Sequence, residues 1–176
     1  PRLLARRAEV VETLVSGVEG LLARHRVRLV AGQGRVTAPG AIAVSGEDGS
    51  AEIVSARAIL VATGSEPVVP PIPGADLPGV VTSDGLLALD WVPASMVVIG
   101  AGVIGTEFAS IYAALGTRVA MVEMADFLMG VDVPLARRYR AILKRQGVAV
   151  STGVQVTDIA PAGEAGLRVT YVEKDR

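Results

Sequence analysis

The stretch MVVIGAGVIGTE occupies residues 96–107 and decides the fold. Its four leading apolar residues predict a buried parallel strand, and three glycines, Gly100, Gly102 and Gly105, follow that strand directly. Residues 103–115 then predict a helix. Its expected buried face consists of Ile104, Phe108, Ile111, Tyr112 and Leu115. A strand, a glycine turn and a helix in this order indicate a βαβ unit that binds a dinucleotide.

The glycine pattern gains weight from its context. With 20 glycines in 176 residues, roughly 0.25 occurrences of the pattern are expected by chance. Here Gly100 would permit the tight turn, Gly102 would let a diphosphate approach the backbone, and Gly105 would let the helix pack close to the strand. The alternative is that the glycines only make a tight turn. The expected diphosphate-binding residues, at the helix N-terminus, are Gly100, Ala101, Gly102, Val103, Ile104 and Gly105.

Glu123 ends the next predicted strand, residues 119–122, and favours NAD over NADP. Its carboxylate can accept hydrogen bonds from both ribose hydroxyls, each contributing about 1.5–3 kcal/mol. Against a 2′-phosphate it would face like charge, at a cost of about 4 kcal/mol per unit charge at 4 Å. The following residues, 124–126, supply no arginine to offset that repulsion.

Glu107 is expected in the first turn of the predicted helix, where two interpretations stay open. An acid at the positive end of a helix is stabilising by about 0.3–1 kcal/mol, which needs no further function. A catalytic role is equally compatible with its spacing.

The first 80 residues predict a helix, a small antiparallel meander and an extended crossing. Residues 66–80 hold five prolines and two glycines, which is typical of a stiff connection without a folded element. The expected elements are a helix over 8–24 (buried face Val11, Leu14, Val15, Val18, Leu21 and Leu22), a strand at 29–31, a hairpin of 41–45 with 51–54, and a buried strand at 58–62.

The last 45 residues continue the alternation of helix and strand. A helix over about 133–146 should bury Leu135, Tyr139, Ile142 and Leu143, a strand should follow at 148–150, and a hairpin should pair 154–159 with 167–172. This alternation predicts an α/β fold with a doubly wound parallel sheet, preceded by part of another domain that carries the antiparallel meander. The expected domains are residues 1–79 and 80–176.

Composition excludes several classes of function. Seventeen basic against 18 acidic residues give no basic footprint for nucleic acid and no membrane-surface patch. The longest uncharged run, residues 91–106, is too short and too broken for a spanning helix. Because the sequence has no cysteine and only His25, it offers neither a thiolate nor a histidine-rich metal site, and no redox-active dithiol. We expect no metal, no nucleic acid and no membrane as partners.

Three local strings line up in the order found in one family. Residues 59–67, ILVATGSEP, resemble the returning strand of an FAD domain, and Thr82-Ser83-Asp84, Leu86-Leu87 and Val98–Glu107 resemble an NAD domain. Together they are similar to the class I pyridine nucleotide-disulfide oxidoreductases, with a Rossmann-like fold. The opening, with Val10–Leu14 and Gly32-Gln33-Gly34, most resembles the dihydrolipoyl dehydrogenases.

The resemblance implies FAD and NAD as cofactors. Gly34 would contact the FAD adenine, and Thr63, Gly64 and Ser65 would line the flavin nucleotide, although these three residues could also form an ordinary strand-ending turn. The other implied contacts are Glu107 beside the nicotinamide and flavin, Glu123 on the adenosine ribose and Val154 against the NAD adenine.

The implied activity passes electrons from dihydrolipoamide through a disulfide and FAD to NAD⁺. The expected partner is dihydrolipoamide or the lipoyl domain of a 2-oxoacid dehydrogenase complex, and the resemblance implies a cytoplasmic homodimer. The family's first FAD motif, its Cys-x4-Cys disulfide and its C-terminal interface domain are absent from these residues, and Pro1 is not a natural start. We therefore expect an internal segment of a longer protein, inactive alone.

Other assignments share the same scaffold. Mercuric reductase, soluble transhydrogenase, NADH oxidase and ferredoxin reductase are alternative enzymes. A non-catalytic nucleotide-binding module is the alternative from a different class, and it predicts NADH binding without turnover.

Overall fold

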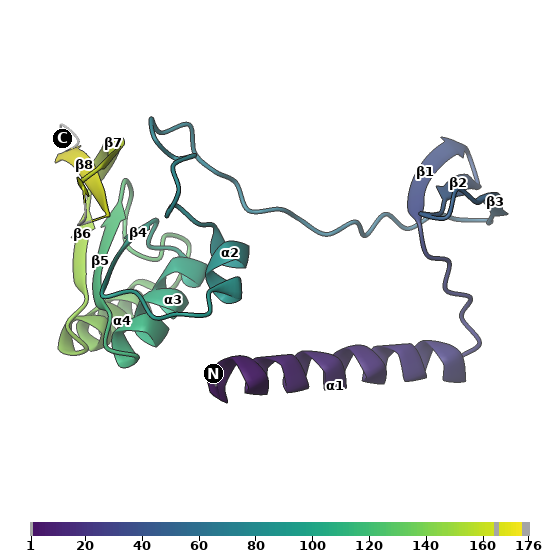
Figure 1. Cartoon of the computed structure of the whole chain (residues 1–176), viewed down its shortest axis with the longest axis horizontal. Helices are drawn as coiled ribbons and strands as arrows, with labels where there is room; N and C mark the ends of the chain where they lie inside the picture. Colours follow the sequence, from purple (N-terminus) through teal and green to yellow (C-terminus); the bar gives the residue numbers. More distant parts are fainter. Residues whose placement is uncertain (1, 164–165, 174–176) are drawn as a thin grey trace. The chain divides into compact units, whose positions relative to one another are not determined.

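The computed structural model describes residues 2–163 and 166–173, and the chain divides into two compact units, Pro1–Ser65 and Glu66–Arg176. The first unit contains helix α1 (Arg2–Arg24) and strands β1 (Gln33–Ala38), β2 (Ala41–Ser45) and β3 (Ala51–Ser55). These strands form an antiparallel meander in the order β1-β2-β3, as Figure 1 shows. The domain boundary expected between residues 79 and 80 stays a prediction.

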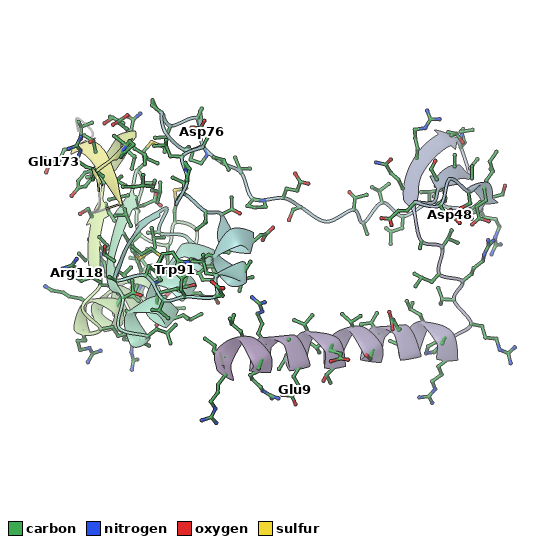
Figure 2. All side chains as sticks on the ribbon, in the orientation of Figure 1. Glu9, Asp48, Asp76, Trp91, Arg118 and Glu173 are labelled. Carbon is green, nitrogen blue, oxygen red and sulfur yellow. The ribbon has the colours of Figure 1, made fainter. Side chains whose placement is uncertain are left out.

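The turn between β2 and β3 is held by Asp48. Its side chain accepts a hydrogen bond from the Ser50 N–H at 2.9 Å, and Gly49 takes a φ of +81°. Hydrogen bonds from the Ser50 side chain and backbone lower the pKa of the Asp48 carboxyl. Asp48 is labelled beside the meander in Figure 2. The hairpin predicted here is confirmed, because short alternating strands flank a strong turn sequence.

Helix α1 differs from the prediction in its burial. The periodic apolar face predicted a buried stripe, yet none of the helix's residues is buried, and Leu14 and Val18 are 64% and 57% exposed. The apolar side chains of this helix face, together with Leu29, line only a shallow groove. Helical periodicity identifies an apolar face, but burial of that face requires a second apolar surface that packs against it. The described part of this unit provides little such surface. The predicted strand at 29–31 is also wrong, because those residues have no strand geometry and pairing starts at Gln33.

Residues 58–62 do not form the predicted strand. They are part of an extended stretch without helix or strand, and Leu60 is 91% exposed. A strand needs hydrogen-bonded neighbours, and none of the strands in residues 2–163 and 166–173 pairs with this segment. The apolar run ILVA therefore has strand propensity without a sheet to join.

The second unit is an α/β unit whose parallel sheet has the order β4-β5-β6. The two crossovers of this sheet are helices, so the predicted fold class is confirmed. Helix α2 was not predicted from the sequence. The bounds are α2 Ser83–Ala88, β4 Ser95–Ile99, α3 Val103–Ala114, β5 Arg118–Glu123, α4 Val133–Arg145, β6 Ala149–Thr152, β7 Val154–Pro161 and β8 Leu167–Glu173.

The core lies on one face of the parallel sheet, where α3 and α4 pack beside the strands (Figure 1). Met121 of β5 and Leu143 of α4 are almost completely buried there, together with Ala109 of α3. On the opposite face Val97 and Ile99 are 43% and 40% exposed. The prediction that β4 is fully buried is therefore wrong, because a parallel strand is buried on both faces only when both are covered.

The buried faces of both helices agree with the prediction at Tyr112 and Leu143 and differ from it at other positions. In α3 the buried residues are Thr106, Ala109 and Tyr112, whereas Ile104 and Ile111 point outward, 60% and 49% exposed. Thr106 and Ala109 are small, and Gly105 lies close to Val98 of β4, so α3 approaches the sheet closely at these positions. In α4 the buried residues are Ala136 and Leu143. The predicted core residues that are exposed are Ile104, Ile111, Leu115, Leu135 and Ile142.

The proline-rich segment docks on the hairpin β7–β8. The Ile159 N–H donates to the Pro73 carbonyl oxygen at 2.9 Å, and a side chain at Gly74, whose φ is +80°, would clash with the Ile159 carbonyl. Residues 66–80 contain no helix or strand, as predicted. The predicted hairpin is confirmed, with β7 antiparallel to β8.

Candidate dinucleotide-binding site

The glycine turn begins where β4 ends. Gly100 has a φ of +106°, a left-handed conformation that favours glycine, and its N–H donates to the Val122 carbonyl oxygen at 2.8 Å. This hydrogen bond extends the β4–β5 ladder by one residue, since Ile99 is already paired with Val122. The turn therefore opens at the carboxyl edge of the parallel sheet, beside the end of β5.

The other two glycines serve different purposes. A Cβ at Gly105 would clash with the Gly100 carbonyl oxygen and lie 3.2 Å from Val98 Cγ1, so glycine permits the close packing of α3 on β4. A Cβ at Gly102 would meet no atom within 4 Å. Gly105 therefore faces the protein, as expected, and Gly102 faces open space; the role of Gly102 at a diphosphate stays a prediction.

The N-terminus of α3 has no side-chain cap, since its N-cap residue is Gly102. By contrast, the N-cap Asp132 of α4 accepts a hydrogen bond from the Leu135 N–H at 3.1 Å. The first N–H groups of a helix have no partner within the helix and carry partial positive charge. An uncapped helix start beside an open glycine turn therefore fits a diphosphate group.

Glu123 lies at the mouth of the turn. One oxygen, Oε2, accepts a hydrogen bond from the Ala101 N–H at 2.7 Å, and Oε1 accepts one from the Ala125 N–H at 2.7 Å. The side chain comes from the last residue of β5 and is half-buried. Because a carboxylate oxygen can accept more than one hydrogen bond, both oxygens keep capacity for ligand hydroxyls.

Leu128 holds the same turn from its other side. Its N–H donates to the Ala101 carbonyl oxygen at 3.0 Å, and its φ is +52°. A left-handed conformation costs a leucine about 1–2 kcal/mol. The sequence analysis missed this residue, because a leucine gives no signal for a conformation that favours glycine and asparagine.

The segment after β5 is anchored by aromatic packing. The Phe127 ring is buried and lies 6.4 Å from the Tyr139 ring between centroids, and the Arg140 guanidinium lies 6.0 Å from the Phe127 ring centre. The Tyr139 hydroxyl donates to the Thr106 carbonyl oxygen at 3.3 Å, which ties α4 to the first turn of α3. These contacts fix the loop that carries Leu128.

The glycine turn, the open helix start and the adjacent acid together have the geometry expected of a dinucleotide-binding site. A sequence model described as pyridine nucleotide-disulphide oxidoreductase matches residues 2–176. The chain belongs to the pyridine nucleotide-disulphide oxidoreductase family. The resemblance stated from the sequence is confirmed, and members of this family use FAD and NAD(H).

Several proteins of similar sequence are dihydrolipoyl dehydrogenases. Dihydrolipoyl dehydrogenase 3 of Pseudomonas putida is 35% identical over 93% of this chain and 35% of its own length, and the Manduca sexta dihydrolipoyl dehydrogenase is 38% identical over 89% and 32%. The chain thus spans about a third of the length of these curated relatives.

Two solved structures share the fold. The HOCl-induced flavoprotein disulfide reductase RclA of Escherichia coli gives a TM-score of 0.83 at 31% identity, over 96% of this chain and 38% of its own. LpdA of Mycobacterium tuberculosis gives a TM-score of 0.85 at 28% identity, over 99% and 39%.

The remaining predicted site residues of this family member lie in several places. Glu107 is exposed and stands in the second turn of α3, because the helix begins at Val103; its expected place in the first turn is wrong. Val154, the first residue of β7, is buried. Gly34 lies on β1, and residues 63–65 lie in the exposed extended segment of the first unit. The structure thus brings together the turn residues and Glu123.

In residues 2–163 and 166–173, no three histidine, cysteine, aspartate or glutamate residues cluster in a way that could hold a metal ion. Within the same described ranges, no helix combines the length and apolar character needed to cross a membrane.

Proposed function

We propose that the chain supplies the NAD site, and part of the FAD site, of a dihydrolipoyl dehydrogenase. The observation that carries the NAD site is the hydrogen bond between the Glu123 carboxylate and the Ala101 N–H. It holds a ribose-binding acid beside the turn whose open face, at Gly102, suits a diphosphate.

The cofactor is proposed to be NAD rather than NADP. The Glu123 carboxylate would receive the ribose hydroxyls, whereas a 2′-phosphate would bring like charge to the same place. Met124, Ala125 and Asp126 follow it and offer no cationic side chain. Recognition of the sugar therefore discriminates against the phosphorylated cofactor.

The proposed contacts of this chain follow from its geometry and its family. The amides from Gly102 to Ile104 would bind the diphosphate, Val154 would pack against the adenine, and Glu107 would lie toward the nicotinamide. When bound, FAD would supply the redox chemistry between the substrate disulfide and NAD⁺. Gly34, Thr63, Gly64 and Ser65 are the residues proposed to contact FAD.

Similarity to dihydrolipoyl dehydrogenases supports the choice of substrate. Relatives with that name are 35% and 38% identical to this chain over about nine tenths of it. Dihydrolipoamide, free or on the lipoyl domain of a 2-oxoacid dehydrogenase complex, is the proposed reductant. A homodimer in the cytoplasm is the proposed state of the whole protein.

A second candidate is another flavoprotein disulfide reductase. The similarity to the solved RclA structure favours it, because that protein shares the fold over 96% of this chain at comparable identity. This candidate keeps the same NAD site and differs only in the disulfide substrate.

The full-length protein, purified with its flavin, tests these proposals. We expect NADH formation from dihydrolipoamide and NAD⁺, with NADP⁺ at least tenfold poorer in kcat/KM, because a like-charge penalty of about 4 kcal/mol exceeds tenfold discrimination. Reduction of other disulfides by NADH without dihydrolipoamide turnover would favour the second candidate. NADH binding without any flavin reduction would indicate a non-catalytic module and contradict both.

A further inference from the structure

Ala101 is held from two directions by the chain that follows β5. Its N–H donates to Glu123 Oε2 at 2.7 Å, and its carbonyl oxygen accepts from the Leu128 N–H at 3.0 Å. The residue itself is completely buried. Both backbone polar groups of the residue that precedes the open face of the turn are therefore fixed by partners outside the turn.

Leu128 makes this contact in an unusual backbone conformation. Its φ of +52° is in the left-handed region, which leucine rarely adopts. The side chain is 6% exposed and belongs to the main apolar cluster, beside Phe127. Its carbonyl oxygen also accepts from the Val131 N–H at 3.0 Å. Burial on one side and the turn on the other hold the residue in this conformation.

We propose that Leu128 is a positioning residue for the diphosphate of the dinucleotide. It acts through the Ala101 carbonyl: fixing that peptide fixes the direction of the amides that follow it, at Gly102 and Val103. The inference rests on the NAD site proposed above. It assigns to the β5–α4 loop, residues 124–132, a function beyond connecting two elements: the loop follows the proposed sugar-binding Glu123 directly, and its middle orients the phosphate-binding turn.

A matched pair of variants separates backbone positioning from side-chain packing. Leu128→Gly and Leu128→Ala both remove the apolar side chain, but only glycine adopts the left-handed conformation without cost. We expect the alanine variant to bind NADH about three- to tenfold more weakly than the glycine variant, the effect of losing about one hydrogen bond. Equal affinities, or weaker binding by the glycine variant, would overturn the proposal.

Two controls exclude general loosening of the loop. Met129 is 77% exposed, so Met129→Gly and Met129→Ala should bind NADH equally. Competition with NADH by adenosine and by ADP-ribose measures the diphosphate separately: the alanine variant at 128 should lose affinity for ADP-ribose and keep that for adenosine. A matching loss for both ligands would contradict a role in orienting the phosphate-binding amides.

A measurement on the wild-type full-length protein covers the case in which the variants at 128 do not fold. Amide hydrogen exchange at Leu128 should slow at least several-fold when NADH is added, because a bound diphosphate holds the turn closed on this donor. Unchanged exchange at Leu128 despite NADH binding would overturn this inference alone. If the wild-type protein binds no NADH, the proposed function fails first.

Discussion

The carboxylate of Glu123 accepts a hydrogen bond from the backbone N–H of Ala101 at 2.7 Å, although the two residues are 22 positions apart in the sequence. The contact joins the end of β5 to the turn after β4. Through this hydrogen bond the proposed sugar-binding acid is attached directly to the proposed phosphate-binding turn. Substitutions at either place therefore affect both.

Replacement of Glu123 tests this double role. Glu123→Ala should weaken NADH binding and reduce discrimination against NADPH, because the like charge is removed. Glu123→Gln should cost about 1–3 kcal/mol of folding stability as well, since both partners of the carboxylate are N–H donors and an amide has a single acceptor oxygen. Kd values for both cofactors and thermal unfolding are the measurements.

Asp126→Asn is the control for Glu123, because it removes a nearby exposed negative charge without touching the turn. It should leave the preference for NADH within about twofold, as expected for a screened surface charge. Similar affinities of the wild-type protein for NADH and NADPH would refute the assignment of Glu123.

Two glycine substitutions distinguish the ligand side of the turn from its protein side. Gly102→Ala places a methyl group where no protein atom lies within 4 Å, so folding stability should change by no more than about 0.5 kcal/mol. NADH binding should nevertheless fall about tenfold or more, because the methyl group occupies the approach to the amides. Unchanged affinity would mean that the open face is not the phosphate site.

Gly105→Ala should behave differently from its neighbour. Its Cβ would clash with the Gly100 carbonyl oxygen and crowd Val98, so α3 must move away from β4. We expect a loss of about 1–3 kcal/mol in folding stability, the usual cost of overpacking, together with weaker NADH binding. Denaturant unfolding measures the first effect. An alanine variant as stable as the wild type would contradict the close packing described above.

The cap of α4 offers a stability test outside the proposed site. Asp132→Ala removes the side chain that accepts from the Leu135 N–H, which should cost about 1 kcal/mol. Asp132→Asn retains a capping oxygen and should recover most of that stability. NADH affinity should remain unchanged in both variants. A selective loss of NADH binding at normal stability would instead place Asp132 in the site.

The hairpin between β2 and β3 has a specific pH dependence. Hydrogen bonds from Ser50 lower the pKa of Asp48, so the folded carboxyl has a lower pKa than the unfolded one. The resulting stabilisation is complete above the unfolded pKa and is lost as the pH falls through the folded pKa. In an NMR titration Ser50→Ala should raise the pKa of Asp48. An ordinary aspartate pKa for Asp48 in the wild type would contradict this hydrogen-bonded turn.

Local patterns in the sequence predicted the turn well. The strand before Gly100, the helix after it and the acid at the end of the next strand are short-range features, and each follows from composition within a few residues. The close approach at Gly105 and the open face at Gly102 were also expected, because only glycine permits both.

Features that depend on partners distant in the sequence were not predictable in this way. Residues 58–62 have the composition of a buried strand but no strand beside them in the described chain. Ile104 and Ile111 were assigned to the core from periodicity, yet α3 buries Thr106 and Ala109 together with Tyr112. The left-handed conformation of Leu128 is imposed by its tertiary contacts, and the sequence around Leu128 gives no indication of it.

A crystal structure of the full-length protein with bound NADH tests the central claim most directly. The account predicts the diphosphate against the amides that follow Ala101, at the start of α3, with the adenosine ribose hydroxyls hydrogen-bonded to the Glu123 carboxylate. A nucleotide bound elsewhere, or a ribose out of reach of Glu123 while the turn remains empty, would contradict it.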